Sequence, residues 1–212
     1  MTINFEGSPI KTFYLGMKER NVANSTVPLQ EAHITIAGAG GLGSNVAIAL
    51  ARSGIGHLTL IDFDNVEPSN LNRQQFKISQ IGMPKVLALQ QNLLEFNPFI
   101  AVTTLNVKVT PANIAVCFAD CDIVCEAFDD PAAKAMLLDG ITQHFPNKPL
   151  VMGNGLAGIH SANTIKTTHP LPNVYICGDG MTAGNEGLMA PRVMTCAGHE
   201  ANVILRLLMH RS

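Results

Sequence analysis

Residues 33–50 read HITIAGAGGLGSNVAIAL, and this stretch decides the fold. It begins with a short apolar, β-branched run of the kind that forms a buried strand. Glycines 38, 40 and 43 then form the pattern G-x-G-x-x-G, and an apolar run rich in small residues follows. We therefore predict a buried strand, a tight glycine turn and a helix that ends near Gly54.

The rest of the chain continues this alternation of strand and helix. A second apolar run at 57–62 completes a βαβ unit, whose strands are parallel and whose crossover is right-handed. The order predicts an α/β fold, a doubly wound, Rossmann-like, mostly parallel sheet with helices on both faces, in a single domain. The other expected elements are helices at 83–98, 111–121, 130–145 and 191–210 and strands at 100–109, 122–128, 149–158 and 160–168.

The domain organisation follows from the same pattern. Residues 1–30 are polar and irregular, and we expect an N-terminal arm with one short helix near 17–24. Residues 31–212 would form the nucleotide-binding domain. The glycine-rich stretch at about 177–190 is expected to be a mobile loop over the site.

Composition excludes several classes of function. The chain has 212 residues and a net charge of -2, so a broad nucleic-acid or anionic-membrane surface is not expected. Residues 34–51 carry no charge, but the glycines in their centre argue against a membrane span. The N-terminus lacks the layout of a secretory signal, and the five cysteines include no CxxC pair. We expect a cytoplasmic protein with reduced thiols and no structural zinc.

The glycine pattern predicts a phosphate site. Gly38 permits the tight turn, Gly40 lets a phosphate approach the backbone, and Gly43 lets helix and strand pack closely. The following helix offers free N–H groups and a partial positive charge to an anion. Asp62 ends the second strand, where a carboxylate can accept hydrogen bonds from ribose hydroxyls. These features fit NAD and ATP equally, so they leave the reaction open.

The next loop favours ATP. It places Asn70, Arg73 and Gln74 beside the nucleotide crevice, and Lys85 begins the following helix. Hydride transfer does not need two cations near the phosphates, whereas attack on an α-phosphate does, because negative charge builds on phosphorus and on departing pyrophosphate.

Two acidic residues follow the strand at 122–128. Asp129 lies at the carboxyl end of this strand, where a carboxylate can hold Mg²⁺ against phosphates. Asp130 directly precedes Pro131 and is expected to cap the next helix.

Together these motifs resemble the ThiF/MoeB family, bacterial relatives of the ubiquitin-activating enzymes. The resemblance rests on GAGGLGSN, LIDFDNVEPSNLNRQ, GMPK and FDD, and it extends over about residues 30–210. The short chain and the segment YICGDGMTAGNEGLMAPRV are most similar to the compact ThiF proteins of thiamine biosynthesis.

The resemblance implies an activity. Such enzymes bind Mg·ATP and adenylate the C-terminal glycine of a small ubiquitin-like sulfur carrier, here ThiS-like, which then receives sulfur as a thiocarboxylate. It also implies a homodimer and a separate sulfur donor protein. By position, Gly38, Gly40, Gly41 and Gly43 would hold phosphates and Asp62 the ribose, Asn70, Arg73 and Lys85 would contact phosphates, and Asp129 would bind the metal.

The sequence also departs from the family. The two CxxC pairs that hold zinc in many relatives are missing. Cys177 is the only cysteine near the glycine-rich loop and is a candidate thiolate nucleophile, although Gly180 occupies the position before MTAG. Arg20 is a candidate for insertion into a partner's active site.

Several alternative functions stay open at this stage. The substrate could be a molybdopterin-type carrier, or the protein could be a peptide-modifying relative. An NAD-dependent oxidoreductase and a non-catalytic binding module are more distant alternatives.

Overall fold

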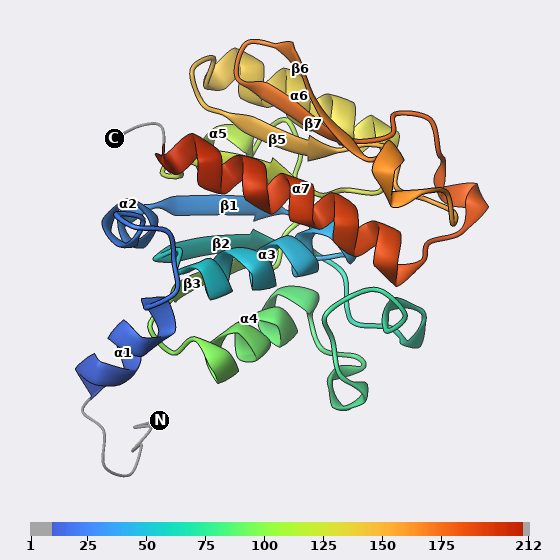
Figure 1. Cartoon of the computed structure of the whole chain (residues 1–212). Helices are drawn as coiled ribbons and strands as arrows, with labels where there is room; N and C mark the ends of the chain where they lie inside the picture. The colour runs from blue at the N-terminus through green and yellow to red at the C-terminus, as the bar shows by residue number, and fades with distance from the viewer. Residues whose placement is uncertain (1–9, 210–212) are drawn as a thin grey trace.

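A seven-stranded sheet forms the centre of the computed structural model, which describes residues 10–209 (Figure 1). The strand order is β3-β2-β1-β4-β5-β7-β6, and every neighbouring pair is parallel except β6 and β7. This arrangement confirms the expected doubly wound α/β fold. The strands are β1 His33–Ala37, β2 His57–Ile61, β3 Ala101–Leu105, β4 Ile123–Glu126, β5 Leu150–Gly153, β6 Lys166–Leu171 and β7 Val174–Gly178.

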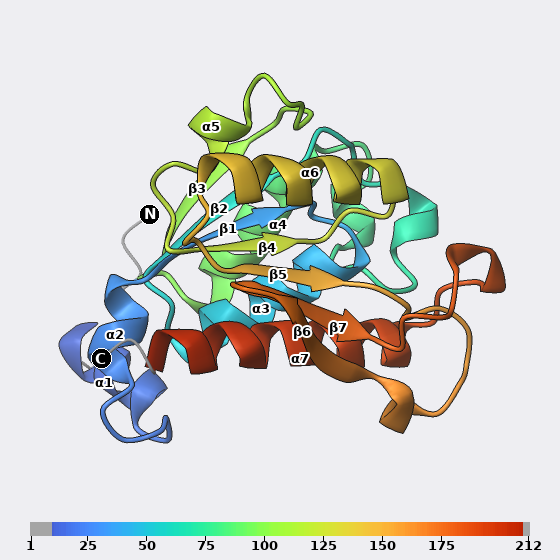
Figure 2. The same ribbon diagram turned by 90° about the horizontal axis from the view of Figure 1, so that it is seen from above.

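Helices cover both faces of the sheet (Figure 2). On one face lie α3 (Gly41–Ser53), α4 (Lys85–Phe96) and the long α7 (Ala190–Met209). On the other lie α5 (Ile114–Cys117) and α6 (Pro131–His144). The buried apolar residues accordingly form two clusters, one on each face, and each fully buried aliphatic side chain contributes roughly 1.5–3 kcal/mol.

The N-terminal segment is more ordered than its polar sequence suggested. Helix α1 spans Ile10–Lys18, earlier than the helix expected near 17–24, and a second helix, α2, spans Thr26–Glu31. Leu29 of α2 is only 4% exposed and belongs to the core cluster that includes α7 residues. Burial of this one leucine explains why a short segment of weak helical pattern is held in place.

The last three strands differ from the expectation. The strand expected at 149–158 is shorter, since β5 ends at Gly153. In place of the strand expected at 160–168, the chain forms a short 3₁₀ helix at Ala162–Thr164 and then β6. Strand β7 was not expected. It pairs with β6 through a hairpin in which Asn173 has φ 61, a left-handed conformation that asparagine tolerates. Strand β6 is exposed along its length, so its sequence lacks the apolar alternation that would have revealed the hairpin.

Among the helices of residues 10–209, not one has both the length and the hydropathy needed to cross a bilayer.

Candidate functional site

A pocket of about 530 Å³ lies at the carboxyl ends of the parallel strands. Most of its wall residues follow the parallel strands β1, β2, β3, β4, β5 and β7. Strands β1 and β4 are neighbours, but the helix after β1 packs on one face of the sheet and the helix after β4 packs on the other. The crevice between two such strands is where doubly wound folds bind ligands. Both the predicted nucleotide site and the glycine-rich loop line this single pocket.

The glycine turn is built as expected. Gly38 has φ 102, and a Cβ there would come within 2.7 Å of the carbonyl oxygen of Ala127. A Cβ on Gly43 would lie 1.8 Å from the carbonyl oxygen of Gly38, so neither position admits a side chain. Gly38, Gly40 and Gly41 line the pocket, whereas Gly43 packs the helix against β1 outside the lining.

Asp62 supports the turn as well as lining the pocket. Its Oδ2 accepts a hydrogen bond from the amide of Ala39 at 2.6 Å, and its Oδ1 accepts one from the amide of Asp64 at 2.8 Å. The carboxylate therefore ties the glycine turn to the loop after β2. Each carboxylate oxygen accepts more than one bond, so Asp62 keeps capacity for a ribose hydroxyl.

Lys85 is held in the pocket wall by an acidic partner. Its Nζ lies 2.8 Å from Oδ2 of Asp64, and its side chain is 9% exposed. Its backbone amide donates to the carbonyl of Asp64 at 2.9 Å. Two bonds to the same residue fix where the ammonium lies, and burial strengthens its field on a bound anion.

Arg73 and Gln74 also reach the pocket, but Asn70 does not. The Oδ1 of Asn70 accepts from the amide of Glu67 at 2.9 Å, and its carbonyl oxygen accepts from the amides of Arg73 and Gln74. Asn70 therefore shapes the turn that presents Arg73. The phosphate contact expected of Asn70 receives no support from this position.

Gln74 received no role from sequence reasoning beyond its place beside the crevice. It is buried, lines the pocket, and its Oε1 has no hydrogen-bond partner. The Nε of Arg73 is also buried without a partner. Because buried polar atoms are normally paired, these two atoms are suited to a polar ligand in the pocket.

The two consecutive aspartates differ in their contacts. Asp130 caps α6, because its Oδ1 accepts from the amide of Ala132 at 3.1 Å, which confirms the expected cap. Asp129 is exposed and lines the pocket. Within residues 10–209 no group of three or more His, Cys, Asp or Glu is arranged to hold a metal ion. A lone carboxylate still fits Mg²⁺, which binds through one or two carboxylates plus substrate phosphates.

An ionic group that reaches the pocket wall through Lys134 was not identified from the sequence. Lys134 of α6 donates to both oxygens of Glu126, at 3.0 and 2.9 Å, and to the carbonyl of Gly153 at 2.9 Å. Glu126 also accepts from the amide of Phe128 at 2.6 Å, next to Asp129. Burial raises the pKa of Glu126, against the opposing effect of Lys134. These contacts join the ends of β4 and β5. The sequence gives no sign of them, because Glu126, Lys134 and Gly153 come together only in the folded structure.

Cys177 lies away from the predicted chemistry. It is fully buried in β7 and does not line the pocket. Burial raises the pKa of its thiol to about 12, so almost no thiolate forms at neutral pH. The nucleophilic role expected for Cys177 receives no support from this position. Arg20 is exposed just after α1 and also lies outside the pocket lining.

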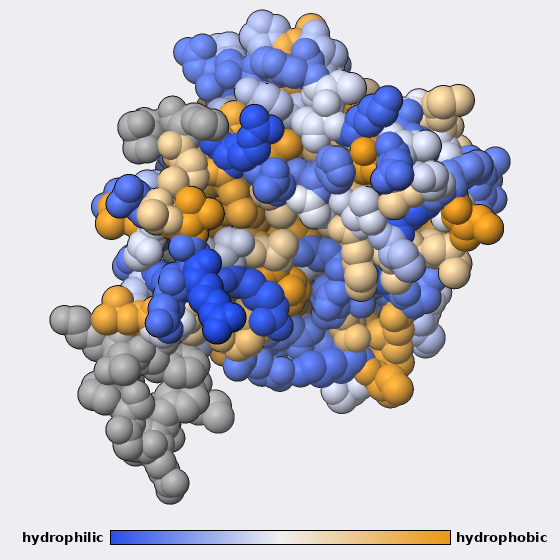
Figure 3. Space-filling view, viewed as in Figure 1, coloured by the Kyte–Doolittle hydropathy of each residue, from blue (hydrophilic) through white to orange (hydrophobic). Residues whose placement is uncertain are grey.

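The two ends of the pocket differ in character. Near the end of β2 and after β3 it is lined by Phe63, Val107 and Val109, with Lys108 over the Phe63 ring at 5.5 Å. This apolar surface suits a planar base. The opposite end is lined by backbone-rich segments at 153–157 and 180–184, with few charged side chains. Met181, Met189 and Met194, in and just after the segment that follows β7, are exposed methionines. Figure 3 shows apolar side chains scattered among polar ones on one face of the molecule.

Fold and site together define a class, the doubly wound proteins that bind a nucleotide at a glycine turn. The particular family follows from comparison: residues 20–211 match the ThiF family, and the chain belongs to that family. It is 32% identical over 188 residues to the molybdopterin-synthase adenylyltransferase of Escherichia coli (strain K12), covering 85% of this chain and 74% of the relative.

Other relatives are longer. The chain is 33% identical over 192 residues to the adenylyltransferase and sulfurtransferase UBA4 of Yarrowia lipolytica, covering 85% of this chain. The chain spans about half of that relative, 46% of its length. Among solved structures, E. coli tRNA N6-threonylcarbamoyladenosine dehydratase in complex with ATP superposes with a TM-score of 0.85 at 25% identity, over 95% of both chains.

Proposed function

We propose that this protein uses ATP to adenylate a carboxylate, and that the carboxylate is the C-terminal glycine of a ubiquitin-like sulfur carrier of the ThiS type. One observation carries the proposal. Arg73, Lys85 and Asp129 come from three separate segments and line one pocket with the glycine turn. A dehydrogenase would leave this set of charges without a task, whereas nucleotidyl transfer uses all of it.

The residues of the pocket have defined tasks in this reaction. ATP lies with its base against the apolar end, its ribose at Asp62 and its phosphates at the glycine turn. A carboxylate oxygen of the carrier attacks the α-phosphorus, the bond to pyrophosphate breaks, and pyrophosphate leaves with the electron pair. Arg73 and Lys85 offset the growing negative charge. Asp129 would hold a magnesium ion, which would supply charge neutralisation at the phosphates.

The far end of the pocket is the expected entry for the carrier tail. Its walls at 153–157 and 180–184 include Gly153, Gly155, Gly180 and Gly184, and they leave a passage with few side chains. A tail ending in glycine has no Cβ and lets its carboxylate approach phosphorus closely. After adenylation, a sulfur donor protein would convert the acyl-adenylate to a thiocarboxylate. A homodimer, with Arg20 near the partner's site, belongs to the same proposal.

The relatives broaden the choice of substrate. The E. coli relative is named for molybdopterin synthase and the Yarrowia relative for sulfur transfer, so a molybdopterin-type carrier is a close alternative. A second candidate is dehydration of a modified tRNA nucleoside, favoured because the tRNA dehydratase matches this chain over 95% of both lengths. The net charge of -2 on the present chain supports a protein substrate rather than an RNA substrate.

A pyrophosphate-exchange assay separates these possibilities. The purified protein, Mg·ATP and labelled pyrophosphate are incubated with a ThiS-type carrier, a molybdopterin-type carrier or tRNA carrying threonylcarbamoyladenosine. Carrier-dependent label in ATP supports adenylation of that carrier, and a carrier that lacks its terminal glycine is the control. Absence of exchange with both carriers contradicts the proposal, and conversion of the tRNA nucleoside, read by mass spectrometry, supports the second candidate. Light scattering of the same sample tests the homodimer.

A further inference from the structure

The segment 179–189 joins β7 to α7 and forms one wall of the far end of the pocket. We call it the β7–α7 loop. Five of its residues at 180–184 and Leu188 line the pocket. None of the charged residues that surround the phosphate end comes from this loop. Whatever fixes its conformation therefore controls the far end of the pocket without contacting the nucleotide end.

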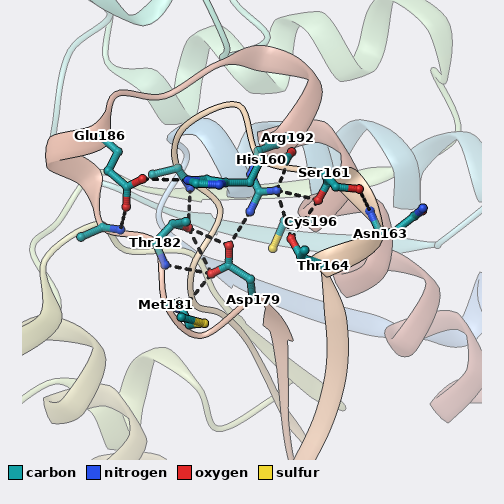
Figure 4. Close-up of polar contacts among 12 residues, drawn as sticks. His160, Ser161, Asn163, Thr164, Asp179, Met181, Thr182, Glu186, Arg192 and Cys196 are labelled. Atoms are coloured by element: carbon teal, nitrogen blue, oxygen red, sulfur yellow. Dashed lines mark hydrogen bonds and ion pairs between the residues drawn. The ribbon is translucent and has the colours of Figure 1, made fainter.

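Asp179 holds the start of the loop (Figure 4). Its Oδ1 accepts from the amide of Met181 at 2.8 Å and from the amide of Thr182 at 2.9 Å. The Thr182 hydroxyl donates to the same carboxylate and accepts from the amide of Ala157 at 3.1 Å. One carboxylate thus fixes the loop and, through Thr182, links it to the facing wall at Ala157.

Arg192, in the first turn of α7, completes the arrangement. Its Nη2 lies 2.5 Å from Oδ2 of Asp179, and the two side chains are 4% and 8% exposed. Its Nη1 donates to the carbonyls of His160 and Ser161, both at 2.9 Å, and to the Thr164 hydroxyl at 3.3 Å. Figure 4 shows this guanidinium between the two segments. The buried ion pair therefore ties the β7–α7 loop to the segment 160–164, which follows the pocket wall at 153–157 in the chain.

The carboxylate of Asp179 also lies close to the backbone of the facing segment. A Cβ on Gly155 would lie 2.1 Å from Oδ1 of Asp179, so the carboxylate packs directly on the pocket wall. Burial acts to raise the pKa of Asp179, but the bonds from Thr182 and Met181 and the charge of Arg192 outweigh it and lower that pKa. The pair is therefore charged at neutral pH, which is the state in which it holds the loop.

A second contact lies further out on the loop. Glu186 meets His160 at 3.0 Å, and both side chains are well exposed, at 40% and 55%. Such exposed pairs contribute little, because water competes for them and salt screens them. Glu186 is thus a suitable control for Asp179: it is an exposed carboxylate on the same loop, and its partner His160 belongs to the segment that Arg192 contacts. Its Oε1 also accepts from the amide of Ala183 at 3.0 Å, and Glu186→Gln keeps this acceptor oxygen.

We propose that Asp179 and Arg192 are positioning residues that hold the β7–α7 loop in place for the second substrate, and not for ATP. This inference rests on the proposed function, because that function makes the far end of the pocket the entry for the carrier tail. The ion pair sets the width of this entry. Loss of the pair should loosen the loop and weaken carrier binding, while the nucleotide end, built from other segments, stays intact.

Three measurements on the full chain test this inference with Asp179→Asn and with Glu186→Gln as its control. We expect Asp179→Asn to raise the KM for a ThiS-type carrier in pyrophosphate exchange by about tenfold, the cost of one charge-assisted contact. The Kd for a fluorescent ATP analogue with Mg²⁺ should stay within about twofold. Hydrogen exchange in a peptide covering 180–183 should become faster. Glu186→Gln should change none of the three appreciably.

Each arm has an outcome that overturns the inference. A Kd for ATP that rises in parallel with the carrier KM, or unchanged hydrogen exchange in 180–183, means that the pair does not act on the loop in this way. Thr182→Val, which removes the hydroxyl bonds to Asp179 and Ala157 but leaves the ion pair with Arg192, is the milder variant if Asp179→Asn does not fold. It should give smaller changes in the same direction. If the carrier KM or the hydrogen exchange stays unchanged in this variant, the inference is overturned.

Failure of the proposed function looks different. If the unaltered protein catalyses no exchange with any carrier ending in Gly-Gly, the adenylation proposal fails. The loop experiment still decides the structural part, because hydrogen exchange and ATP affinity need no carrier.

Discussion

The ammonium of Lys85 lies 2.8 Å from the carboxylate of Asp64, and this ion pair forms part of the wall of the nucleotide pocket. Lys85 begins α4, whereas Asp64 belongs to the loop after β2, so the pair joins two segments 21 residues apart. The aspartate holds the cation in position before any ligand arrives. Preorganised charge of this kind is what stabilises a transition state at low cost.

Substitution of Arg73 or Lys85 should slow adenylation strongly. We expect Lys85→Ala and Arg73→Ala each to reduce the rate of pyrophosphate exchange on the order of 10²–10³-fold, because each removes charge that offsets the departing pyrophosphate. Lys77→Ala is the control, since Lys77 forms an exposed ion pair with Glu95. Near-normal turnover in both pocket variants would remove these residues from the mechanism.

Asp129 and Asp130 provide a matched pair of substitutions. We expect Asp129→Ala to raise the Mg²⁺ concentration needed for half-maximal exchange, with little change in the free energy of unfolding. Asp130→Ala should lower that free energy by about 1 kcal/mol through loss of the α6 cap, with a nearly unchanged Mg²⁺ requirement. Denaturant titration and a magnesium titration measure the two effects. The metal assignment fails if both variants show the same Mg²⁺ dependence as the unaltered protein.

Cys177 should be dispensable both for adenylation and for the later thiocarboxylation. Burial raises the pKa of its thiol to about 12, so we expect Cys177→Ala to retain pyrophosphate exchange and carrier thiocarboxylation. Alkylation followed by mass spectrometry should modify the half-exposed Cys117 well before Cys177. Loss of thiocarboxylation with exchange intact would restore the nucleophilic role, and loss of exchange would mean that Cys177 shapes the nucleotide site.

The stability of the protein should depend on pH through His57. Its ring stacks on that of His33 with centroids 3.8 Å apart, and Nε2 of His57 lies 2.9 Å from the Thr103 hydroxyl. Burial, followed by the neighbouring His33, lowers the pKa of His57 from 6.5. The unfolded chain then binds more protons between the lowered pKa and 6.5, so stability is complete above pH 6.5 and falls as the pH falls through this window.

Denaturant titrations from pH 7.5 down to pH 5 measure this dependence. His57→Gln should flatten the curve over that range, and His144→Gln, at an exposed position, should leave it unchanged. An unchanged slope in His57→Gln would assign the pH dependence to other groups.

The local pattern of glycines and apolar residues in the sequence predicted most of the strands and helices. The glycines at 38, 40 and 43 and the apolar runs around them predicted β1, the turn and α3, because tight turns and buried strands depend on nearby residues. The β6–β7 hairpin was missed, since an exposed edge strand has no apolar alternation. Helix α2 was missed for the opposite reason: the burial of Leu29 in the core holds it, not its own propensity.

The site divides in the same way. By itself the sequence determined which residues carry charge and which ends of strands they follow, and Arg73, Lys85 and Asp129 do line the pocket. The tertiary structure alone decided that Asn70 supports a turn, that Cys177 is buried in β7, and that Asp179 pairs with Arg192 across the loop. The physical reason is that burial and long-range hydrogen bonds depend on distances between segments, and a linear pattern of residue types does not specify those distances.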